Sequence, residues 1–314
     1  MIKPYFIFEV TPNCDFNCIY CYNVWKEKPD YQQKTLSLDK AKELFNKILS
    51  ETEIEGVTIT GGEPMLYPNL FELVEFLNKK GLEIGLTTHG ALLNDEKTKK
   101  LIDAGVSYFE ISLDALDELI YNKLTGDNQL DKIKKTILSI KKYGATLTIS
   151  TIISKLNLEE IPKIIDFSFA FSADFISLNR FIPGGQGKQN IEKLMPSNAQ
   201  LKNILEQANQ KAKKYNFKIN ISVPIEDCII KHSNYPNLNF GTCMCGVKKW
   251  LIDSIGNLRS CEQNTEIIGN LFTTSFAELA NAEVSQNFRK NNLKNNCNNC
   301  HAFLNCGGGC RFVR

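Results

Sequence analysis

Short runs of β-branched and aromatic residues alternate with longer amphipathic stretches through the first two-thirds of the chain. The runs predict six strands, at 5–10, 56–60, 82–88, 106–113, 145–153 and 174–182. The stretches between them predict helices near 38–51, 68–80, 95–104, 129–143 and 158–170. Ser37 and Asn94 stand where helix-capping residues are expected. This order indicates repeated strand–helix units, and hence an α/β fold built on a parallel sheet.

The pattern leaves two architectures open, an open doubly wound sheet and a partial barrel. In both of them, the side chains that do chemistry gather at the carboxyl ends of the strands. A further helix near 197–215 and a strand at 217–223 complete this region. After Pro224 the apolar runs shorten, and Asn, Gly and Cys become frequent. We therefore expect a larger domain at 1–225 and a small cysteine-rich domain at 226–314.

Composition excludes several classes of protein. The chain has 314 residues, a formal net charge of +2 and 43% hydrophobic residues, so it can bury a core without disulfides. Near-neutral charge argues against a nucleic-acid surface, and no apolar run approaches the ~20 residues that cross a membrane. No secretory signal is visible. We expect a cytoplasmic protein whose 11 cysteines bind metal or do redox chemistry.

Three of these cysteines follow the first predicted strand directly. In TPNCDFNCIYCYN, the spacing C-x3-C-x2-C places Cys14, Cys18 and Cys21 on one loop. A [4Fe–4S] cluster normally takes four cysteines, so a loop with three leaves one iron open to a small ligand. The alternative is a zinc site or chance. However, zinc motifs usually come as paired units, and no second unit or histidine pair lies nearby in the sequence.

The loop resembles the cluster-binding signature of the radical S-adenosylmethionine (radical SAM) enzymes, including Tyr20 before the third cysteine and Tyr22 after it. The resemblance implies a partial (β/α)6, TIM-like barrel. It also implies that S-adenosylmethionine binds the open iron of the [4Fe–4S] cluster. In that family, an electron from the cluster cleaves the sulfonium to methionine and a 5′-deoxyadenosyl radical, which removes a hydrogen atom from the substrate.

The segment after the second predicted strand adds to the resemblance. TGGEP at 60–64 matches the family's Gly-Gly-Glu motif. Gly61 and Gly62 permit a close backbone approach, and Glu63, followed by Pro64, could accept a hydrogen bond from the ammonium group of the bound molecule. The segment is not a phosphate-binding loop, because the Gly-x4-Gly-Lys spacing is missing.

Later strand ends supply the remaining expected contacts to S-adenosylmethionine. In EISLDAL, Ser112 and Asp114 stand where the family places its ribose and carboxylate contacts. His89 lies in TTHG, where many family members read Thr-Asn-Gly. It is either a polar replacement at this site or a proton donor. Arg180 could pair with the carboxylate of S-adenosylmethionine, or it could be a surface arginine beside the glycine-rich loop PGGQG.

The tail carries a second group of cysteines. Its last segment has the spacing C-x2-C-x5-C-x3-C and resembles the SPASM extension of peptide-modifying radical SAM enzymes. The upstream element of that extension matches Cys245, Gly256 and Cys261. The resemblance implies one auxiliary [4Fe–4S] cluster on Cys243, Cys245, Cys261 and Cys310. It implies a second one on Cys297, Cys300 and Cys306.

This second set departs from the family, because the final cysteine expected beyond Cys310 is absent. Cys228 could substitute, the cluster could keep an open iron, or the chain could be truncated; a zinc-bound tail is a further alternative. Auxiliary clusters can accept an electron or bind substrate. Glu262 resembles an acidic position that sulfatase maturases use as a base, and a surface glutamate is the alternative.

Together these features predict an enzyme that oxidatively modifies a peptide or protein side chain, as in ribosomal-peptide or sulfatase maturation. Modification of a small molecule or tetrapyrrole, as in the heme pathway, is the second hypothesis. The third is a non-catalytic iron–sulfur or zinc scaffold. We expect a flavodoxin- or ferredoxin-type electron donor. A separate leader-peptide-binding protein is one way to present the substrate, since no winged-helix module precedes the first strand. Nucleic acid and membrane partners are not expected.

Overall fold

The computed structural model describes residues 3–27, 34–291, 297 and 299–313. In this part of the chain one sheet runs in the order β11-β10-β9-β1-β2-β3-β4-β5-β6-β7-β8. In chain order, the first seven strands are β1 (Tyr5–Glu9), β2 (Gly56–Thr60), β3 (Glu83–Thr88), β4 (Tyr108–Ser112), β5 (Thr146–Ile153), β6 (Phe175–Arg180) and β7 (Ile219–Ile221). The others are β8 (Leu238–Phe240), β9 (Lys249–Ile252), β10 (Asn257–Arg259) and β11 (Gly269–Asn270).

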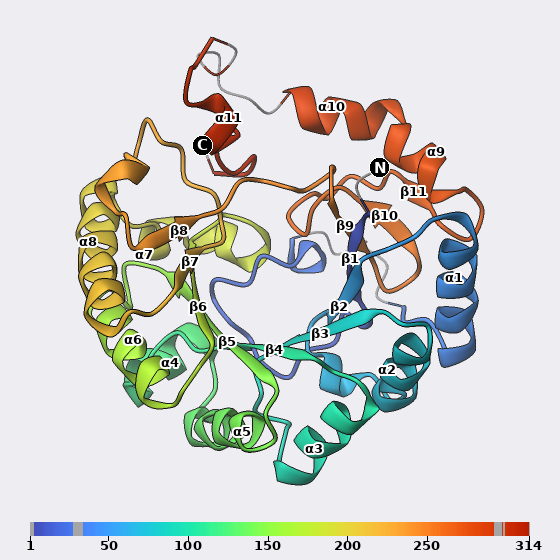
Figure 1. The fold of residues 1–314 in the computed structure, drawn as a ribbon, viewed down its shortest axis with the longest axis horizontal. Coiled ribbons are helices and arrows are strands. Elements are labelled where there is room, and N and C mark those ends of the chain that lie inside the picture. The colour runs from blue at the N-terminus through green and yellow to red at the C-terminus, as the bar shows by residue number, and fades with distance from the viewer. Residues whose placement is uncertain (1–2, 28–33, 292–296, 298, 314) are drawn as a thin grey trace.

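Helices form a ring outside the curved sheet, as Figure 1 shows. They are α1 (Leu38–Glu51), α2 (Leu70–Lys79), α3 (Asp95–Ala104), α4 (Glu118–Thr125), α5 (Leu130–Lys142), α6 (Ile161–Ala170), α7 (Ile191–Leu194) and α8 (Asn198–Tyr215). Since β1 to β8 pair in parallel, the architecture is the expected partial barrel. The six predicted strands are confirmed, with ends shifted by two residues at most.

The strand pattern sorts side chains between the core and the barrel interior. In β5, Leu147, Ile149, Thr151 and Ile153 are buried, whereas the residues that alternate with them are only half-buried. Because successive side chains point to opposite faces, the buried set packs under the helices and the polar set faces inward. Phe8 of β1 and Phe45 of α1 show the same packing, with ring centroids 5.3 Å apart.

The cysteine-rich region extends this sheet instead of forming a separate one. β9 pairs in parallel with β1, and β10 and β11 continue antiparallel. The short helices α9 (Phe276–Asn281), α10 (Glu283–Asn291) and α11 (Phe303–Cys306) follow. Arg259 of β10 donates to Glu9 of β1 at 2.5 Å, and both side chains are buried. The boundary at residue 225 stays a prediction about domains, since strands from both sides of it share one sheet.

None of the helices in the described residues is both long enough and apolar enough to span a membrane.

Candidate active site

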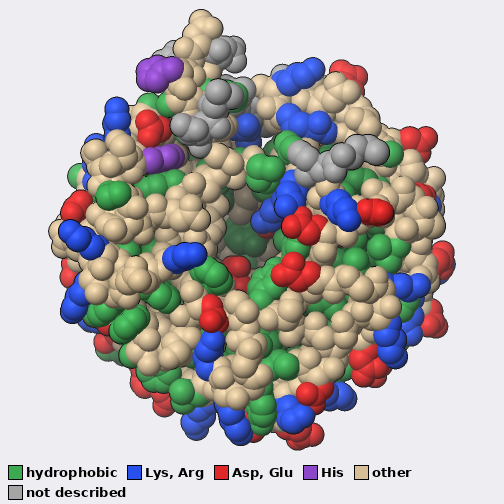
Figure 2. Space-filling view, viewed as in Figure 1, with side chains coloured by type: hydrophobic (Ala, Val, Ile, Leu, Met, Phe, Trp, Pro, Cys, Tyr) green, Lys and Arg blue, Asp and Glu red, His purple; other side chains and the backbone are tan. Residues whose placement is uncertain are grey.

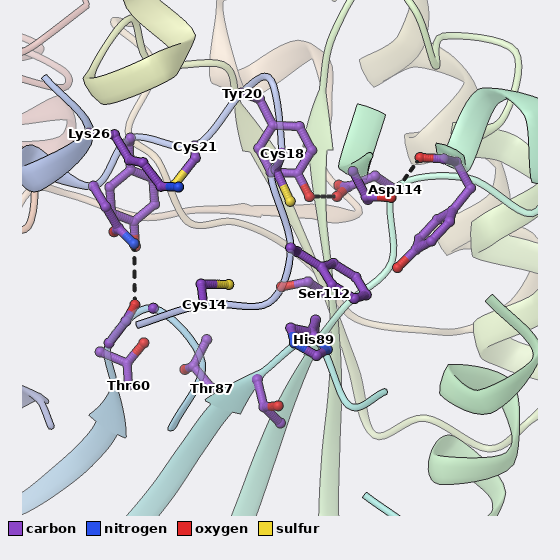
Figure 3. Close-up of a pocket in the computed structure, with 18 residues that line it drawn as sticks. Cys14, Cys18, Tyr20, Cys21, Lys26, Thr60, Thr87, His89, Ser112 and Asp114 are labelled. Atoms are coloured by element: carbon purple, nitrogen blue, oxygen red, sulfur yellow. Dashed lines mark hydrogen bonds between the residues drawn. The ribbon is translucent and has the colours of Figure 1, made fainter. Parts of the chain in front are cut away.

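The loop between β1 and the 3-10 helix Val24–Lys26 forms one wall of a pocket at the carboxyl ends of the strands. Figure 3 shows the sulfurs of Cys14, Cys18 and Cys21 around one opening, with Ser112 and His89 beside it. The sequence-predicted residues that line this pocket are Cys14, Cys18, Cys21, Tyr22, Gly61, Gly62, His89, Ser112 and Asp114. The pocket thus gathers residues from β1, β2, β3 and β4.

Two glycines bring the β2 loop against the backbone of the cysteine loop. The amide of Gly62 donates to the carbonyl of Thr11 at 2.8 Å, and the amide of Glu63 donates to the carbonyl of Asn13 at 2.7 Å. A Cβ atom on Gly62 would lie 2.1 Å from the Asn13 oxygen, and one on Gly61 would lie 2.3 Å from the Thr11 oxygen. Only glycine permits this approach.

The carboxylate of Glu63 is buried and holds the end of β3. It accepts from Thr88 Oγ1 at 2.7 Å, from the amide of Met65 at 3.0 Å and from the amide of His89 at 3.1 Å. Burial raises the pKa of Glu63, although the nearby His89 and these hydrogen bonds oppose the shift. Neither Glu63 nor Pro64 lines the pocket. Their expected contact with S-adenosylmethionine stays a prediction.

His89 connects the cysteine loop to the Gly-Gly-Glu segment. Its Nδ1 accepts from the amide of Ala91 at 3.0 Å, so the proton of the neutral ring is on Nε2. That Nε2 lies 2.9 Å from Asp15 Oδ1 and 3.1 Å from Glu63 Oε2. The ring also stacks on Phe16, with centroids 3.9 Å apart. Of the two interpretations, these contacts favour a polar residue that fixes the site over a free proton donor.

Asp114 fixes the cysteine loop from the other side. Its Oδ2 accepts from the Tyr20 hydroxyl at 2.5 Å, and its Oδ1 accepts from the amide of Ile152 at 2.7 Å. Burial raises the pKa of Asp114 to about 6. Ser112, the last residue of β4, is two residues earlier and also lines the pocket. The assignment of Ser112 and Asp114 to S-adenosylmethionine stays a prediction.

The glycine-rich loop after β6 packs on the cysteine loop, a role that the sequence did not reveal. The amide of Gly187 donates to the carbonyl of Cys21 at 3.1 Å. A Cβ atom on Gly185 would lie 2.6 Å from the carbonyl oxygens of Cys21 and Asn23. A Cβ atom on Gly184 would lie 2.4 Å from Oε1 of Gln263, in the cysteine-rich region. This loop therefore joins the two cysteine regions.

Arg180 lies outside the set of pocket-lining residues. Its Nη1 is 2.7 Å from Oε2 of Glu226, and both side chains are largely buried. Arg180 is therefore neither a simple surface arginine nor placed in the described pocket. A contact between Arg180 and S-adenosylmethionine stays a prediction, which this ion pair does not favour.

Part of the second cysteine group comes together near the barrel. One ligand atom each of Cys245, Cys261 and Glu262 lies within 4.8 Å of the others, and the Cys243 side chain is hydrogen-bonded to Cys245. The pKa of the Cys310 thiol is raised, mainly by burial. The nearby Cys243 adds to this shift, so Cys310 lies close to Cys243. The four cysteines predicted for the first auxiliary cluster therefore lie in one neighbourhood.

The other three tail cysteines lie around α11. The amide of Cys300 donates to the carbonyl of Cys297 at 3.2 Å, and Cys306 Sγ accepts from the amide of Gly308 at 3.2 Å. Within the described residues, they belong to no close group of metal-binding side chains. Cys228 is exposed. A second auxiliary cluster on Cys297, Cys300 and Cys306, and its fourth ligand, stay predictions.

Glu262 forms an ion pair at the inner edge of this group. Its Oε1 lies 2.6 Å from Nζ of Lys249 on β9. Burial opposes ionisation of Glu262, but the charge of Lys249 and its hydrogen bond outweigh burial and lower the pKa of the carboxyl. Glu262 is thus held as a carboxylate able to accept a proton, and its role as a base stays a prediction.

The residues present suit iron–sulfur clusters. Cysteine thiolates are the usual protein ligands of such clusters, and the first pocket offers three of them beside the rings of Phe16 and Tyr20. Burial raises the pKa of the Cys14 thiol to about 12, so binding of iron must displace its proton.

Comparison with known proteins identifies the class. Residues 8–168 match the Radical SAM superfamily, and residues 243–301 match SPASM, an iron-sulfur cluster-binding domain. The chain belongs to the Radical SAM superfamily and carries a SPASM domain. It is an enzyme whose cofactors are [4Fe–4S] clusters and S-adenosylmethionine.

Similar proteins include both peptide-modifying and heme-pathway enzymes. The AdoMet-dependent heme synthase of Methanosarcina barkeri is 26% identical, over 96% of this chain and 89% of the relative. The PqqA peptide cyclase of Bradyrhizobium diazoefficiens is 26% identical, over 97% of this chain and 80% of the relative. The fold matches the crystal structure of Streptococcus suis SuiB bound to precursor peptide SuiA with a TM-score of 0.77. That match has 19% identity and covers 99% of this chain and 72% of SuiB.

Proposed function

We propose that this enzyme is a radical SAM/SPASM maturase that oxidatively modifies a side chain of a peptide or protein. The observation that carries the proposal is the contact between its two cysteine regions. Gly184 lies against both Gln263, two residues after Cys261, and Tyr22, next to Cys21. An electron acceptor in the SPASM domain would therefore lie close to the site where hydrogen is removed. The similarity to PqqA peptide cyclase supports a peptide substrate.

When bound, the cluster and S-adenosylmethionine supply the reagent that removes one hydrogen atom from the substrate. The chain's own residues hold that reagent in place. Asp114 anchors the cysteine loop through Tyr20, and Gly62 and Glu63 anchor it through backbone hydrogen bonds. Ser112 presents a hydroxyl to the same pocket. This arrangement fixes the cysteine loop on two sides.

Completing the oxidation requires the loss of one proton and one electron from the substrate. The carboxylate of Glu262 accepts the proton, and Lys249 keeps that carboxylate ionised beforehand. Cys243, Cys245, Cys261 and Cys310 would hold an auxiliary cluster, and that cluster, when bound, would serve as the electron acceptor. An external flavodoxin- or ferredoxin-type protein supplies the initiating electron, and a separate protein that binds the leader peptide is part of the same proposal. In this proposal, residues 1–225 form the barrel domain and residues 226–314 form the cysteine-rich domain.

A second function, tetrapyrrole modification, is favoured by one specific observation. The heme synthase of Methanosarcina barkeri matches 96% of this chain, and 89% of its own length is covered. Under this alternative the same barrel and clusters act on a small molecule.

The test uses anaerobically reconstituted enzyme with S-adenosylmethionine and dithionite. Release of 5′-deoxyadenosine is expected, and its absence would contradict both functions. Peptides encoded beside the gene and heme precursors are then supplied separately. A peptide that loses the mass of two hydrogen atoms, or gains a cross-link, supports the maturase. Turnover of heme precursors alone overturns it. In Glu262→Gln, loss of product with 5′-deoxyadenosine still formed would support the role of Glu262 as a base.

A further inference from the structure

The barrel interior contains a carboxylate, Glu110, that the reaction described above does not use. It lies in the middle of β4, where Tyr108, Glu110 and Ser112 are half-buried and the alternating Phe109 and Ile111 are buried in the core. Since side chains alternate across a strand, Glu110 shares the inward face with Ser112, which lines the pocket. Glu110 therefore faces the same interior space, one step deeper in the barrel.

The neighbouring strands line this interior with small polar side chains. Ser150 of β5 is hydrogen-bonded to Glu110 and accepts from Asn179 Nδ2 of β6 at 2.9 Å. Further along, the hydroxyls of Ser177 and Ser222 lie 2.6 Å apart. The interior of a small barrel is usually filled by bulky apolar residues, whereas this wall offers small side chains with hydrogen-bonding groups. Figure 2 shows one face of the molecule, with a hollow in its middle and acidic and basic side chains along the edge of that hollow.

Charges from the opposite wall reach Glu110 across this space. Lys249 of β9 favours the ionised form of Glu110, and Glu262 opposes it. Three strands separate β9 from β4 in the sheet, which corresponds to about 19 Å measured along it. In a curved sheet, strands this far apart along the sheet stand on different walls of the interior, so Lys249 and Glu262 lie on another wall than Glu110. A group bound in this interior would therefore lie between Glu110 and the Lys249–Glu262 pair.

Two cations beside this interior already have carboxylate partners. Lys249 pairs with Glu262, and Arg259 pairs with Glu9. No ion pair joins Glu110 to a lysine, arginine or histidine of the described part of the chain. Burial raises the pKa of Glu110, and the hydrogen bond from Ser150 and the charge of Lys249 only partly compensate. A carboxylate that is partly shielded from water and has no close cation is less stable than a paired one, and a cation brought by a ligand would relieve that cost.

We propose that Glu110 selects the substrate by binding a cationic group, the ammonium of a lysine or the guanidinium of an arginine side chain, inside the barrel. This inference rests on the proposed function, since it assigns that cation to a peptide. Ser150 and Asn179 position the carboxylate, and the Lys249–Glu262 pair marks the opposite wall of the binding space.

The test measures binding of defined probes to the reconstituted enzyme with S-adenosylmethionine bound. The probes are blocked pentapeptides, acetyl-Gly-Gly-Xaa-Gly-Gly-amide, in which Xaa is Lys, Arg, Gln, Leu or Glu. Dissociation constants come from equilibrium dialysis. We expect the Lys and Arg peptides to bind the wild type at least about tenfold more tightly than the Glu peptide, as for a charge-assisted hydrogen bond.

The variants separate charge from structure. Glu110→Gln should lose the preference for Lys and Arg, whereas Glu110→Asp, which keeps the charge, should retain part of it. Glu83→Gln, on an exposed residue at the start of β3, is the matched control and should bind like the wild type. Iron content and circular dichroism verify that each variant is folded and loaded.

Three results would overturn the inference. Two of them contradict the role of Glu110 but leave the peptide maturase untouched. In the first, the wild type binds the peptides without preferring Lys or Arg. In the second, the Glu110→Gln variant keeps that preference. The third is a wild type that releases 5′-deoxyadenosine but binds none of the peptides, which contradicts the peptide maturase as well.

Discussion

His89 illustrates what a single unusual residue contributes to this site. In sequence it is a departure from the Thr-Asn-Gly of its family, and it could be a replacement or a proton donor. In the structure both ring nitrogens have partners, and the ring stacks on Phe16. Its contacts to Asp15 and Glu63 link the cysteine loop to the Gly-Gly-Glu segment. His89 is therefore best described as a positioning residue.

This description predicts different outcomes for two substitutions of His89. His89→Phe keeps a ring beside Phe16 but leaves the buried amide of Ala91 without its acceptor, which costs about 1–3 kcal/mol. We expect a lower thermal midpoint and loss of iron on gel filtration. His89→Asn offers an oxygen to an amide two residues later and should be much milder. Equal iron retention and thermal midpoints in His89→Phe and the wild type would contradict the positioning role.

At the scale of elements, the contact between the β2 loop and the cysteine loop depends on the absence of side chains. Gly62→Ala would place a methyl group where the Asn13 carbonyl lies, so the loop that carries Cys14 must move. We expect this variant to bind clearly less iron and to bind S-adenosylmethionine weakly. Gly241→Ala is the matched control, because the nearest atom to its Cβ would be 3.5 Å away and its backbone is unstrained. If Gly62→Ala takes up iron as Gly241→Ala does, the contact does not position the loop.

The packing of α3 against α5 supplies a prediction about pH. Asp95, at the start of α3, accepts from Tyr143 at 2.6 Å, from Ser139 at 2.8 Å and from Lys142 at 2.9 Å. These hydrogen bonds lower the pKa of Asp95 to about 2. The bond from Tyr143 has the largest effect, followed by those from Lys142 and Ser139. An unfolded aspartate has a pKa of about 3.9, so the ionised form stabilises the fold above about pH 4. That contribution disappears as the pH falls from about 4 to 2.

Asp95→Asn should therefore unfold at a lower temperature than the wild type near neutral pH. The carboxyl side chain is 54% exposed, so the effect should be modest. The difference in thermal midpoint should stay constant between about pH 8 and 5 and shrink below about pH 4. Thermal unfolding followed by circular dichroism at several pH values measures it. A difference that grows on acidification would show that the sign is wrong.

The elements themselves were largely predictable from the sequence, because each has a local cause. Strand alternation and caps such as Ser37 and Asn94 located the β1–β6 strands and five outer helices. The helix α4 was missed, since it has only eight residues and its cap, Asp117, lies directly after a loop motif. The cysteine loop and the residues at the ends of β2 to β4 were found because spacing along the chain identified them.

At the scale of the whole molecule, contacts between distant segments escaped the sequence. Nothing local shows that Arg259 pairs with Glu9, 250 residues away, or that Arg180 pairs with Glu226. The same holds for β9, which joins the sheet beside β1, and for Gly184, which lies against Gln263. These contacts fuse the cysteine-rich region to the barrel. They also place its first group of thiols close to the barrel interior, which the proposed division of chemistry requires.

That division predicts that iron can be removed from the two regions separately. Replacing Cys14, Cys18 and Cys21 with alanine should remove about four irons and abolish release of 5′-deoxyadenosine. Replacing Cys245 and Cys261 with alanine should also remove about four irons, but 5′-deoxyadenosine should still form while the substrate is no longer modified. Iron and sulfide analysis with product chromatography measures both. Cys228→Ala, on an exposed cysteine, is the control and should retain all its iron unless Cys228 is a ligand of the second auxiliary cluster. Should the Cys245 and Cys261 variant lose cleavage of S-adenosylmethionine although folded, the two regions would not divide the reaction as proposed.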